Sequence, residues 1–456
     1  MTPPNGSDTI FALATAMARA AVAIVRVSGP TAFDSLASLS GLKAPAIKPR
    51  EARLTRLKAP ETGNEIDQAL VLPFFGPASF TGEDMVEYHI HGGPAVIHAV
   101  LDTLAACDGH RMAEPGEFTR RAFENGKLDL TSAEAVNDLV CAETEAQRTQ
   151  ALDQLGGALS SLYDRWRTRL VESAAYLEAT IDFADEDLPE DDIFEQVRPG
   201  IENIQNEIAE HLSDNRQGER LRDGIRIAVV GAPNAGKSSL VNALSRREAC
   251  ITSDIEGTTR DVIEVYLNLG GFPVIISDTA GLRPSQLGTG AQHTIESEGI
   301  RRAIEAAQKA DFKILVFDST SLPDLHPDTL ALLSKNDIVV LNKIDRADTL
   351  PETIDGHRPV LVSATEDKGL EALSSTVTDH IKGLLGQRSG PSPTRARHRQ
   401  ALERALSALQ NANHPKEPEL IAEDLRSAAR ALGAITGRVD VEDLLDVIFR
   451  DFCIGK

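Results

Sequence analysis

One stretch, GAPNAGKSS at 231–239, constrains the fold of this chain more than any other. The apolar run Ile227–Val230 precedes it, and Leu240–Leu244 continues after it in a helical pattern. A strand, a glycine-rich loop ending in Lys-Ser and a helix together are typical of a phosphate-binding loop. The backbone N–H groups of such a loop and the N-terminus of its helix form an anion site. We therefore expect Lys237 to reach the β- and γ-phosphates of a nucleotide and Ser238 to hold Mg²⁺.

Three further motifs, each at the end of an apolar run, indicate which nucleotide binds. Asp278-Thr-Ala-Gly281 places a carboxylate near Mg²⁺ and a backbone N–H near the γ-phosphate. In Asn342-Lys-Ile-Asp345, the aspartate accepts from the N1–H and 2-amino groups of guanine, whereas adenine would leave it unpaired. Ser363-Ala364 resembles the last motif of GTPases. Because ligands bind outside the carboxyl ends of parallel strands, the four motifs predict an α/β domain that binds GTP.

The composition limits the number of domains and the classes of function open to this chain. A chain of 456 residues is expected to hold two or three domains. Its formal net charge of -22 argues against a standing, non-specific nucleic-acid binder, because phosphate affinity depends on clustered Lys and Arg. The four cysteines show no CxxC spacing, so neither a disulfide framework nor a zinc site is indicated. Arg19 interrupts the alanine-rich stretch Ile10–Val27, and no apolar run has bilayer length, so we expect a cytoplasmic protein without a membrane span.

Residues 8 to about 125 have an α+β pattern. Strand patterns at Val22–Val27, Ala69–Leu72 and Met85–Ile90 alternate with helical ones. His89 and His91 form an HxH motif, which suggests a metal site. Alternation along a strand is the preferred interpretation, because no third ligand is in view.

From Thr131 onward the pattern is helical. Thr131-Ser-Ala-Glu134 is typical of a capping box, and helical spacing continues to about Ile181. An acidic break at 182–192 is interpreted as a solvated loop, with a divalent-cation site as the less favoured alternative. Helical spacing returns from about Ile193 to Arg216, and again after a Gly/Ser/Pro/Arg-rich linker. The simplest architecture inserts the GTP-binding domain between two halves of a helical domain. The predicted domains are 1–125 (N-terminal α+β), 126–217 (helical, first half), 218–384 (GTPase) and 385–456 (linker and helical second half).

Three segments outside the nucleotide motifs resemble one family. SFTGEDMVEYHIHGGP at 79–94, PGEFTRRAFENGKLDLTSAEAV at 115–136 and FCIGK at 452–456 are similar to the MnmE (TrmE) family of tRNA-modification GTPases. The resemblance implies a multidomain fold: an α+β N-terminal dimerisation and folate-binding domain, an all-α helical domain and an inserted α/β Ras-like P-loop GTPase domain. It also implies a homodimer that, with the flavoprotein MnmG in a heterotetramer, adds an aminomethyl or carboxymethylaminomethyl group to the wobble uridine of certain tRNAs.

The resemblance further implies how GTP is hydrolysed. Ras-type GTPases orient the attacking water with a Gln just after the DTAG motif, whereas this chain has Leu282 there, which cannot do so. In the family, K⁺ supplies the missing positive charge. The water-orienting residue maps to Glu296, with Glu298 as a rival and a solvated helix Glu as the alternative. The implied catalytic residues are Glu296 and Lys237, the K⁺ ligands Asn234, Ser253, Ile255 and Thr258, and the Mg²⁺ ligands Ser238 and Thr259. The implied GTP-binding residues are Asn234, Ala235, Gly236, Lys237, Ser238, Ser239, Ser253, Asp254, Ile255, Glu256, Gly257, Thr258, Thr259, Asp278, Thr279, Ala280, Gly281, Asn342, Lys343, Asp345, Ser363 and Ala364.

The family's folate contacts map to charged residues of this chain. A 5,10-methylene- or 5-formyl-tetrahydrofolate carries carboxylates that suit Lys and Arg, and a pterin donor edge that suits Glu. Each mapped folate contact alone is equally well interpreted as an ordinary surface or strand charge. The family's Pro/Gly-rich stretch near the start, like PPGRGGVGI, is replaced here by Ala16–Ile24, and alanine adopts positive φ less readily than glycine. Cys453 is either a reactive thiol or a buried small hydrophobe. The mapped folate contacts are Arg26, Glu87, Lys127 and Lys456.

Two other classes of GTPase remain as alternatives. A regulatory switch in ribosome assembly often carries a basic RNA-binding domain, and none follows residue 384. A membrane-remodelling GTPase would carry an amphipathic basic stretch, which the sequence lacks. Arg395–Arg399 is a candidate RNA patch, or equally the solvated start of a helix.

Overall fold

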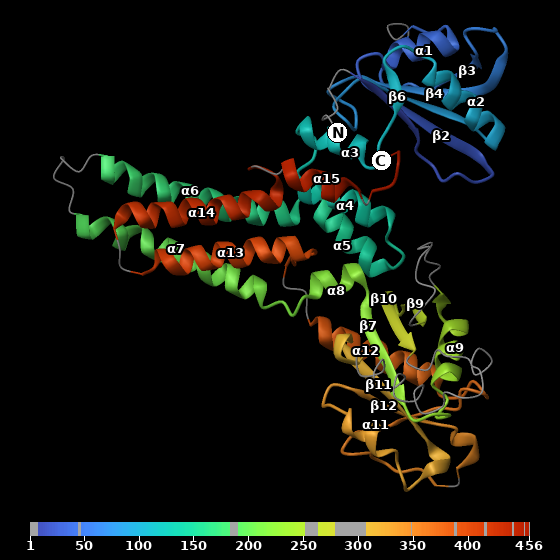
Figure 1. Cartoon of the computed structure of the whole chain (residues 1–456), viewed down its shortest axis with the longest axis vertical. Helices are drawn as coiled ribbons and strands as arrows, with labels where there is room; N and C mark the ends of the chain where they lie inside the picture. The colour runs from blue at the N-terminus through green and yellow to red at the C-terminus, as the bar shows by residue number, and fades with distance from the viewer. Residues whose placement is uncertain are drawn as a thin grey trace, which may run out of the picture. The chain divides into compact units, whose positions relative to one another are not determined.

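The computed structural model describes residues 8–43, 47–182, 190–250, 263–278, 307–347, 349–386, 390–414, 417–439, 442–450 and 452–455. The chain divides into two compact units (Figure 1). The first comprises Met1–Asn137, Leu155–Glu190 and Lys416–Lys456, and the second comprises Asp138–Gln154 and Asp191–Pro415. None of the described helices is both long and apolar enough to cross a membrane.

The first unit contains a six-stranded sheet in the order β3-β4-β5-β2-β1-β6. All neighbouring strands are antiparallel except β1 and β6. Helices α1 (Ala32–Ser40) and α2 (Pro94–Ala105) pack on one face, because alternate residues such as Val25, Val27 and Tyr88 are apolar and fully buried there. Arg26 and Glu87 lie between these positions in sequence and so belong to the other face. The strands are β1 (Thr9–Leu13), β2 (Ala20–Ser28), β3 (Arg53–Lys58), β4 (Glu65–Phe74), β5 (Met85–Gly92) and β6 (His110–Met112).

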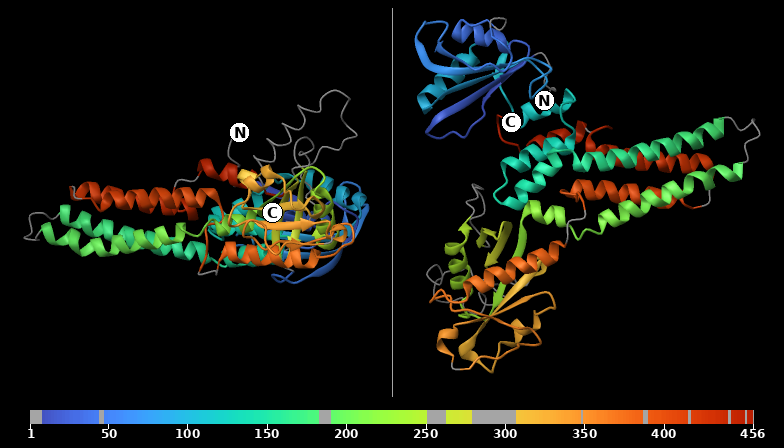
Figure 2. Two further views of the ribbon diagram at one scale, coloured as in Figure 1. Left: turned by 90° about the horizontal axis from the view of Figure 1, so that it is seen from below. Right: turned by 180° about the vertical axis from the view of Figure 1, so that it is seen from behind.

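The helices of the first unit include a pair that pack side by side, α6 (Ala158–Asp182) and α14 (Pro418–Thr436), although the two are far apart in sequence (Figure 2). Helices α3 (Glu117–Glu124), α4 (Leu130–Val140) and α15 (Glu442–Arg450) complete the set. Leu130 and Ala133 of α4 pack against Leu445 and Phe449 of α15 in a small apolar cluster.

The predicted capping box at Thr131 is wrong in its position. Helix α4 already begins at Leu130, and the side chain of Asp129 accepts from the Ser132 N–H at 2.8 Å and from the Thr131 hydroxyl at 2.6 Å. Aspartate is as good an N-cap as Ser or Thr. Because the side chain of Asp129 caps the Ser132 N–H, Thr131 and Glu134 become buried helical positions instead.

The second unit contains a seven-stranded sheet in the order β13-β12-β11-β7-β10-β9-β8. Strands β13 to β10 in this order are parallel, and β9 and β8 are antiparallel. The apolar strands β7, β11 and β12 are buried in its centre. The strands are β7 (Ile225–Gly231), β8 (Ala249–Cys250), β9 (Ile263–Leu269), β10 (Phe272–Asp278), β11 (Phe312–Asp318), β12 (Ile338–Asn342) and β13 (Val360–Leu361). The helices are α5 (Glu145–Leu155), α7 (Glu190–Leu212), α8 (Gln217–Asp223), α9 (Lys237–Arg247), α11 (Pro327–Ala331), α12 (Leu370–Leu385) and α13 (Ala396–Ala412), with 3-10 turns η3 (Ser319–Ser321) and η4 (Ile344–Arg346).

Two stretches predicted as helical are divided differently in the structure. The helix predicted to end at Arg216 stops at Leu212, and α8 follows as a separate helix. Asn215 and Arg216 have φ of 52° and 57°, a left-handed conformation that interrupts a right-handed helix. The stretch predicted as helical from Thr131 to Ile181 consists of α4, α5 and α6.

The segments that precede and follow the GTP-binding domain are held together in the second unit. Asp138 accepts from Arg222 at 3.0 Å and from Arg395 at 2.8 Å, so a single carboxylate joins both segments. A Cβ at Gly218 would lie 2.2 Å from the carbonyl oxygen of Pro393, which shows how closely the segments approach. Arg399 is likewise paired, with Asp214 and Glu219. Two arginines of the candidate RNA patch are therefore engaged in ion pairs within the chain.

Candidate nucleotide-binding site

The loop between β7 and α9 is folded around the amine of Lys237. This side chain is buried, and its Nζ donates to the carbonyl of Gly231 at 2.9 Å and to that of Ala232 at 3.0 Å. Helix α9 begins at Lys237, so the amides of its first turn have no acceptor within the helix. An ammonium beside helix-start amides is an arrangement suited to phosphate groups.

Two glycines of this loop cannot be replaced without displacing the backbone. Gly236 has φ of +91°, and a Cβ there would lie 2.2 Å from the side-chain nitrogen of Asn342. A Cβ at Gly231 would lie 2.4 Å from the carbonyl oxygen of Val316 on β11. The loop is therefore pressed directly against the ends of β11 and β12.

The first two residues of the Asn342-Lys-Ile-Asp345 motif donate hydrogen bonds to the backbone of the phosphate-binding loop. The buried amide of Asn342 donates to the carbonyl of Ala235 at 2.9 Å and accepts from the Ala364 N–H at 3.2 Å. Lys343 donates to the carbonyl of Asn234 at 2.6 Å. Three motifs that are far apart in sequence are thus joined by hydrogen bonds at one edge of the sheet.

The carboxylate expected to recognise guanine is held by the last motif. The Ser363 hydroxyl donates to Asp345 at 2.6 Å, and this bond is the main cause that holds the pKa of Asp345 below its ordinary value. An ionised carboxylate can accept two hydrogen bonds from one edge of a base. A cleft of about 660 Å³ lies close by, lined by residues of α9 and of the segment after Ser363, among them Ser239, Asn242 and Thr365.

Only some of the other predicted nucleotide ligands lie among the described residues. Ser238 and Ser239 lie in the first turn of α9. Asp278 is the last residue of β10 and pairs in register with Val229 of β7, so its backbone lies at the same edge of the sheet as the loop. The remaining predicted ligands lie outside the described residues: Ser253, Asp254, Ile255, Glu256, Gly257, Thr258, Thr259, Thr279, Ala280, Gly281, Glu296 and its rival Glu298.

A second candidate site lies on the face of the N-terminal sheet opposite α1 and α2. Arg26 and Glu87 face each other on β2 and β5, and the guanidinium donates to the carboxylate at 2.9 and 3.1 Å. The guanidinium carbon lies 5.3 Å from the ring centroid of Phe80 and 5.7 Å from that of Phe118, within cation–π range. Lys127 donates to the carbonyl of Pro77 at 2.9 Å, in the segment that leads to Phe80. Arg26 and Lys127 thus both contact the loop that holds Pro77 and Phe80, and Glu87 pairs with Arg26. The fourth predicted folate contact, Lys456, lies outside the described residues.

Each histidine of the HxH motif lies near a carboxylate. His91 pairs through Nδ1 with Asp67 at 2.7 Å, and the nearest charged partner of His89 is Glu87 at 3.5 Å. Among the described residues, no three His, Cys, Asp or Glu side chains are grouped so as to hold a metal ion. The preferred interpretation, alternation along a strand, is confirmed by β5.

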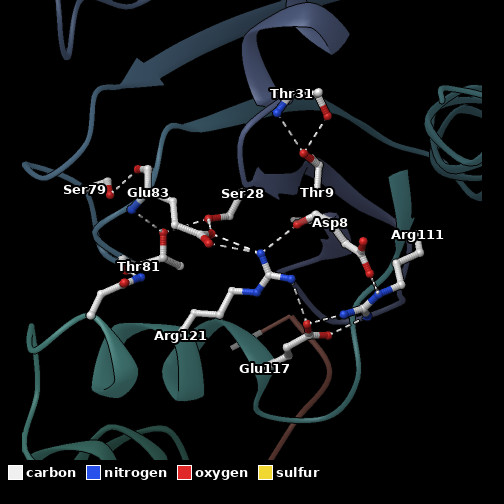
Figure 3. Close-up of polar contacts among 11 residues, drawn as sticks. Asp8, Thr9, Ser28, Thr31, Ser79, Thr81, Glu83, Arg111, Glu117 and Arg121 are labelled. Atoms are coloured by element: carbon white, nitrogen blue, oxygen red, sulfur yellow. Dashed lines mark hydrogen bonds and ion pairs between the residues drawn. The ribbon is translucent and has the colours of Figure 1, made fainter. Parts of the chain in front are cut away.

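A buried ionic network fixes α3 beside this second site (Figure 3). Glu117 accepts from Arg111 at 2.6 and 2.8 Å and from Arg121 at 3.0 Å. Arg121 continues to Glu83 at 3.1 Å and to the carbonyl of Asp8 at 2.9 Å. Burial alone would raise the pKa of Glu117, but the two arginines and the Glu114 N–H outweigh it and hold that pKa below its ordinary value. The network positions α3, and with it the Phe118 ring against Arg26.

The C-terminal segment is bound to the same part of the first unit. Phe452 is buried and packs on Phe449, with ring centroids 5.1 Å apart, and the Cys453 carbonyl accepts from the Gly116 N–H at 3.4 Å. A Cβ at Gly455 would lie 2.3 Å from the carbonyl oxygen of Leu13 at the end of β1. Cys453 itself is exposed. Its alternative interpretation as a buried small hydrophobe is therefore wrong.

Comparison with known proteins identifies the family. Residues 130–453 match the family described as the MnmE helical domain, and residues 9–127 match the GTP-binding protein TrmE N-terminus. The tRNA modification GTPase MnmE of Parvibaculum lavamentivorans is 52% identical over 98% of this chain and 100% of its own length. The chain belongs to the MnmE (TrmE) family. The MnmE protein of Paramagnetospirillum magneticum is also 52% identical, over 99% of this chain, and that of Rickettsia bellii is 43% identical, over 98%.

Membership of the MnmE family confirms the resemblance carried by the three flanking segments, and the predicted multidomain fold with it. Sequence reasoning missed several residues of the two sites. Phe80 and Phe118 were not predicted as partners of Arg26, and their spacing gives no signal because they meet only through the fold. Asp318 was also missed, although an apolar strand that ends in a carboxylate is visible in the sequence.

Proposed function

We propose that this chain is a K⁺-stimulated GTPase whose cycle drives modification of the wobble uridine of certain tRNAs, together with the flavoprotein MnmG. The observation that carries the GTPase assignment is the joining of the phosphate-binding loop, Asn342 and Ser363-Ala364 by hydrogen bonds at one edge of a parallel sheet. The MnmE relatives are named tRNA modification GTPases, which supports the second half of the proposal.

GTP binding follows from the groups at that edge. Lys237 and the first amides of α9 would hold the β- and γ-phosphates, and Asp345 would accept from guanine. Mg²⁺ would be held by Ser238 and Thr259 and would neutralise charge on the phosphate oxygens. The structure of the loop supports this fit, because glycine occupies the two loop positions, 231 and 236, at which a side chain would collide with β11 and β12.

Potassium would replace the arginine finger that other GTPases use. Leu282 cannot orient water, and an arginine finger contributes about 10³–10⁵ in rate, so another cation is needed. Asn234 has φ of 62°, and its carbonyl is held by Lys343. We propose that its side chain, together with Ser253, Ile255 and Thr258, holds K⁺, and that Glu296 orients the attacking water.

The second site would bind a tetrahydrofolate. Glu87, held in place by Arg26, would accept from the donor edge of the pterin, while Lys127 would meet a carboxylate, and Phe80 and Phe118 offer aromatic surface beside Arg26. A bound methylene-tetrahydrofolate would supply one carbon. The C-terminal segment runs beside Leu13, one residue along β1 from Ala12, which pairs in register with Arg26. Lys456 and the exposed Cys453 would therefore complete this site.

Mass analysis of wobble nucleosides separates the proposal from its alternative. Cells lacking the protein should lose the 5-aminomethyl or carboxymethylaminomethyl uridine derivatives, and the full-length chain should restore them. A regulatory switch in ribosome assembly would instead leave the nucleosides unchanged and alter the ribosomal subunit profile. We further expect a homodimer that forms a heterotetramer with MnmG, which size measurement of the mixed proteins would test.

A further inference from the structure

Asp318 lies beside the nucleotide site but belongs to none of its motifs. It is the last residue of β11, the strand between β7 and β12, and it pairs in register with Asn342. Its carboxylate is therefore carried to the edge of the sheet at which the phosphate-binding loop and the guanine-recognition motif meet. The side chain is only 17% exposed there.

The two oxygens of Asp318 have separate partners. One accepts from the N–H of Thr320 at 2.9 Å and from its hydroxyl at 2.7 Å, which caps the short turn η3. The other accepts from the amine of Lys343 at 2.6 Å. Burial raises the pKa of Asp318, but the bonds from Lys343 and Thr320 outweigh it and leave the pKa below its ordinary value. The carboxylate is therefore ionised at neutral pH, and it is a charged partner for the lysine.

Lys343 connects Asp318 to the phosphate-binding loop. Its amine also donates to the carbonyl of Asn234 at 2.6 Å. Ser319, which follows Asp318, is buried and donates to the carbonyl of Lys343 at 2.8 Å, so the lysine is held at both its backbone and its amine. Lys343 and Asn234 both have φ of 62°, a conformation that non-glycine residues adopt only when their surroundings hold them. Asp318 thus begins a chain of contacts that ends at Asn234.

We propose that Asp318 is a positioning residue, which fixes Lys343 against the carbonyl of Asn234 and thereby couples the guanine-recognition motif to the residue that holds K⁺. The K⁺ half of this inference rests on the proposed function, whereas the nucleotide half does not. Without the carboxylate, Lys343 keeps a single neutral acceptor and its flexible stem regains rotamer freedom. The contact that holds the left-handed backbone of Asn234 is then weakened. Both nucleotide retention and K⁺ affinity should fall.

The test is Asp318→Asn in the full-length protein. An amide has a single oxygen, so it can cap Thr320 or accept from Lys343, but not both, and it carries no charge. Asparagine and aspartate cap a turn equally well, so we expect residue 318 to keep its bond to Thr320 and to lose its contact with Lys343. The matched control is Thr320→Val, which removes the hydroxyl bond to Asp318 but keeps the carboxylate and its ion pair with Lys343.

Two measurements read out the effect. The first is the dissociation rate of a fluorescent N-methylanthraniloyl GDP, chased with unlabelled GDP. The second is GTP hydrolysis against K⁺ concentration, with NaCl added to hold ionic strength constant. For Asp318→Asn we expect GDP to dissociate about five- to tenfold faster, with a similar rise in the K⁺ concentration for half-maximal stimulation. The change should fall on KM for GTP and on K⁺ half-saturation, whereas kcat with both saturating should change less than about twofold.

A double-mutant cycle decides whether Lys343 carries the effect. In a Lys343→Met background, Asp318→Asn should add nothing to the GDP dissociation rate. An undiminished effect in that background would overturn the inference, as would a wild-type dissociation rate in the single variant, or an equal effect of Thr320→Val. If the wild-type protein hydrolyses GTP equally in KCl and NaCl, the K⁺ part of the proposed function fails, and the GDP dissociation rates still decide the role of Asp318. If Asp318→Asn does not fold, as judged by circular dichroism, Asp318→Ser, which also caps a turn, takes its place.

Discussion

Replacing Glu117 by Gln should destabilise the first unit, because the carboxylate is the centre of the ionic network around α3. Its oxygens accept from Arg111 at 2.6 and 2.8 Å, from Arg121 at 3.0 Å and from the Glu114 N–H at 2.9 Å. Glutamine keeps one oxygen, so two of these four bonds are lost whichever way the amide turns. Breaking a buried ion pair costs about 3–5 kcal/mol. Here Arg111 keeps its bond to Asp8 and Arg121 keeps its bond to Glu83, so we expect a smaller loss, about 2–3 kcal/mol.

Urea denaturation followed by far-ultraviolet circular dichroism measures this change. A loss of about 2–3 kcal/mol shifts the midpoint of the affected transition by roughly 1–2 M urea. The matched control is Glu114→Gln, the same change in an exposed residue three positions earlier, before α3 begins, which should stay within about 0.5 kcal/mol. If the two variants unfold together at pH 7, the network does not hold α3 and the reasoning is refuted.

The pH dependence gives an independent check on the same residue. Because the folded-state pKa of Glu117 is lowered from 4.5, its charge contributes stability that is fully present above that value and is lost as pH falls toward the folded-state pKa. The gap between the wild-type protein and Glu117→Gln should therefore close below about pH 4.5. A gap that widens in acid would contradict the assignment.

Four further outcomes follow from the two sites. Gly236→Ala should abolish GTP binding measured by calorimetry, because its Cβ would lie 2.2 Å from the Asn342 side chain. Asn234→Ala should remove the difference between GTP turnover in KCl and in NaCl at equal ionic strength, and equal rates in the wild-type protein would refute the K⁺ site. Glu296→Ala should lower kcat in a steady-state assay with little change in GTP affinity, and the same phenotype in its rival alone would show that the segment is misaligned. Deleting 453–456 should abolish the modified nucleoside while GTP hydrolysis continues, and full modification by the truncated protein would refute the role of the tail.

The sequence was informative where chemistry is local. The loop Gly231–Lys237, with its flanking strand and helix, follows directly from the motif, because glycine, lysine and helix start are adjacent in the chain. The start of α4 was misplaced because Thr131 and Asp129 are both good caps, and only the fold decides between them. The break before α8 was missed because Asn215 and Arg216 adopt left-handed conformations that helical periodicity does not reveal.

Contacts between distant segments were the part that sequence reasoning could not supply. Asp318 and Lys343 are 25 residues apart and meet because β11 and β12 are neighbouring parallel strands whose carboxyl ends coincide. Phe118 reaches Arg26 because the network of Glu117 and the apolar contacts of Phe118 with Ile10 and Ala12 hold α3 against the sheet. In both cases one residue, Asp318 or Glu117, holds another in place. Neither its residue type nor its spacing in the sequence predicts that role.

The two sites are built from separate sets of residues, and this separation bears on how their activities can be linked. Among the described residues, every contact that places the C-terminal segment comes from the first unit: Gly116, Phe449 and Leu13. The hydrogen bonds from Asn342 and Lys343 that support the phosphate-binding loop come from the second. No side chain in the described structure serves both. We expect any coupling between GTP hydrolysis and tRNA modification to run through a conformational equilibrium that both sites bias, so a variant that breaks one site's chemistry should leave the other's intrinsic binding intact.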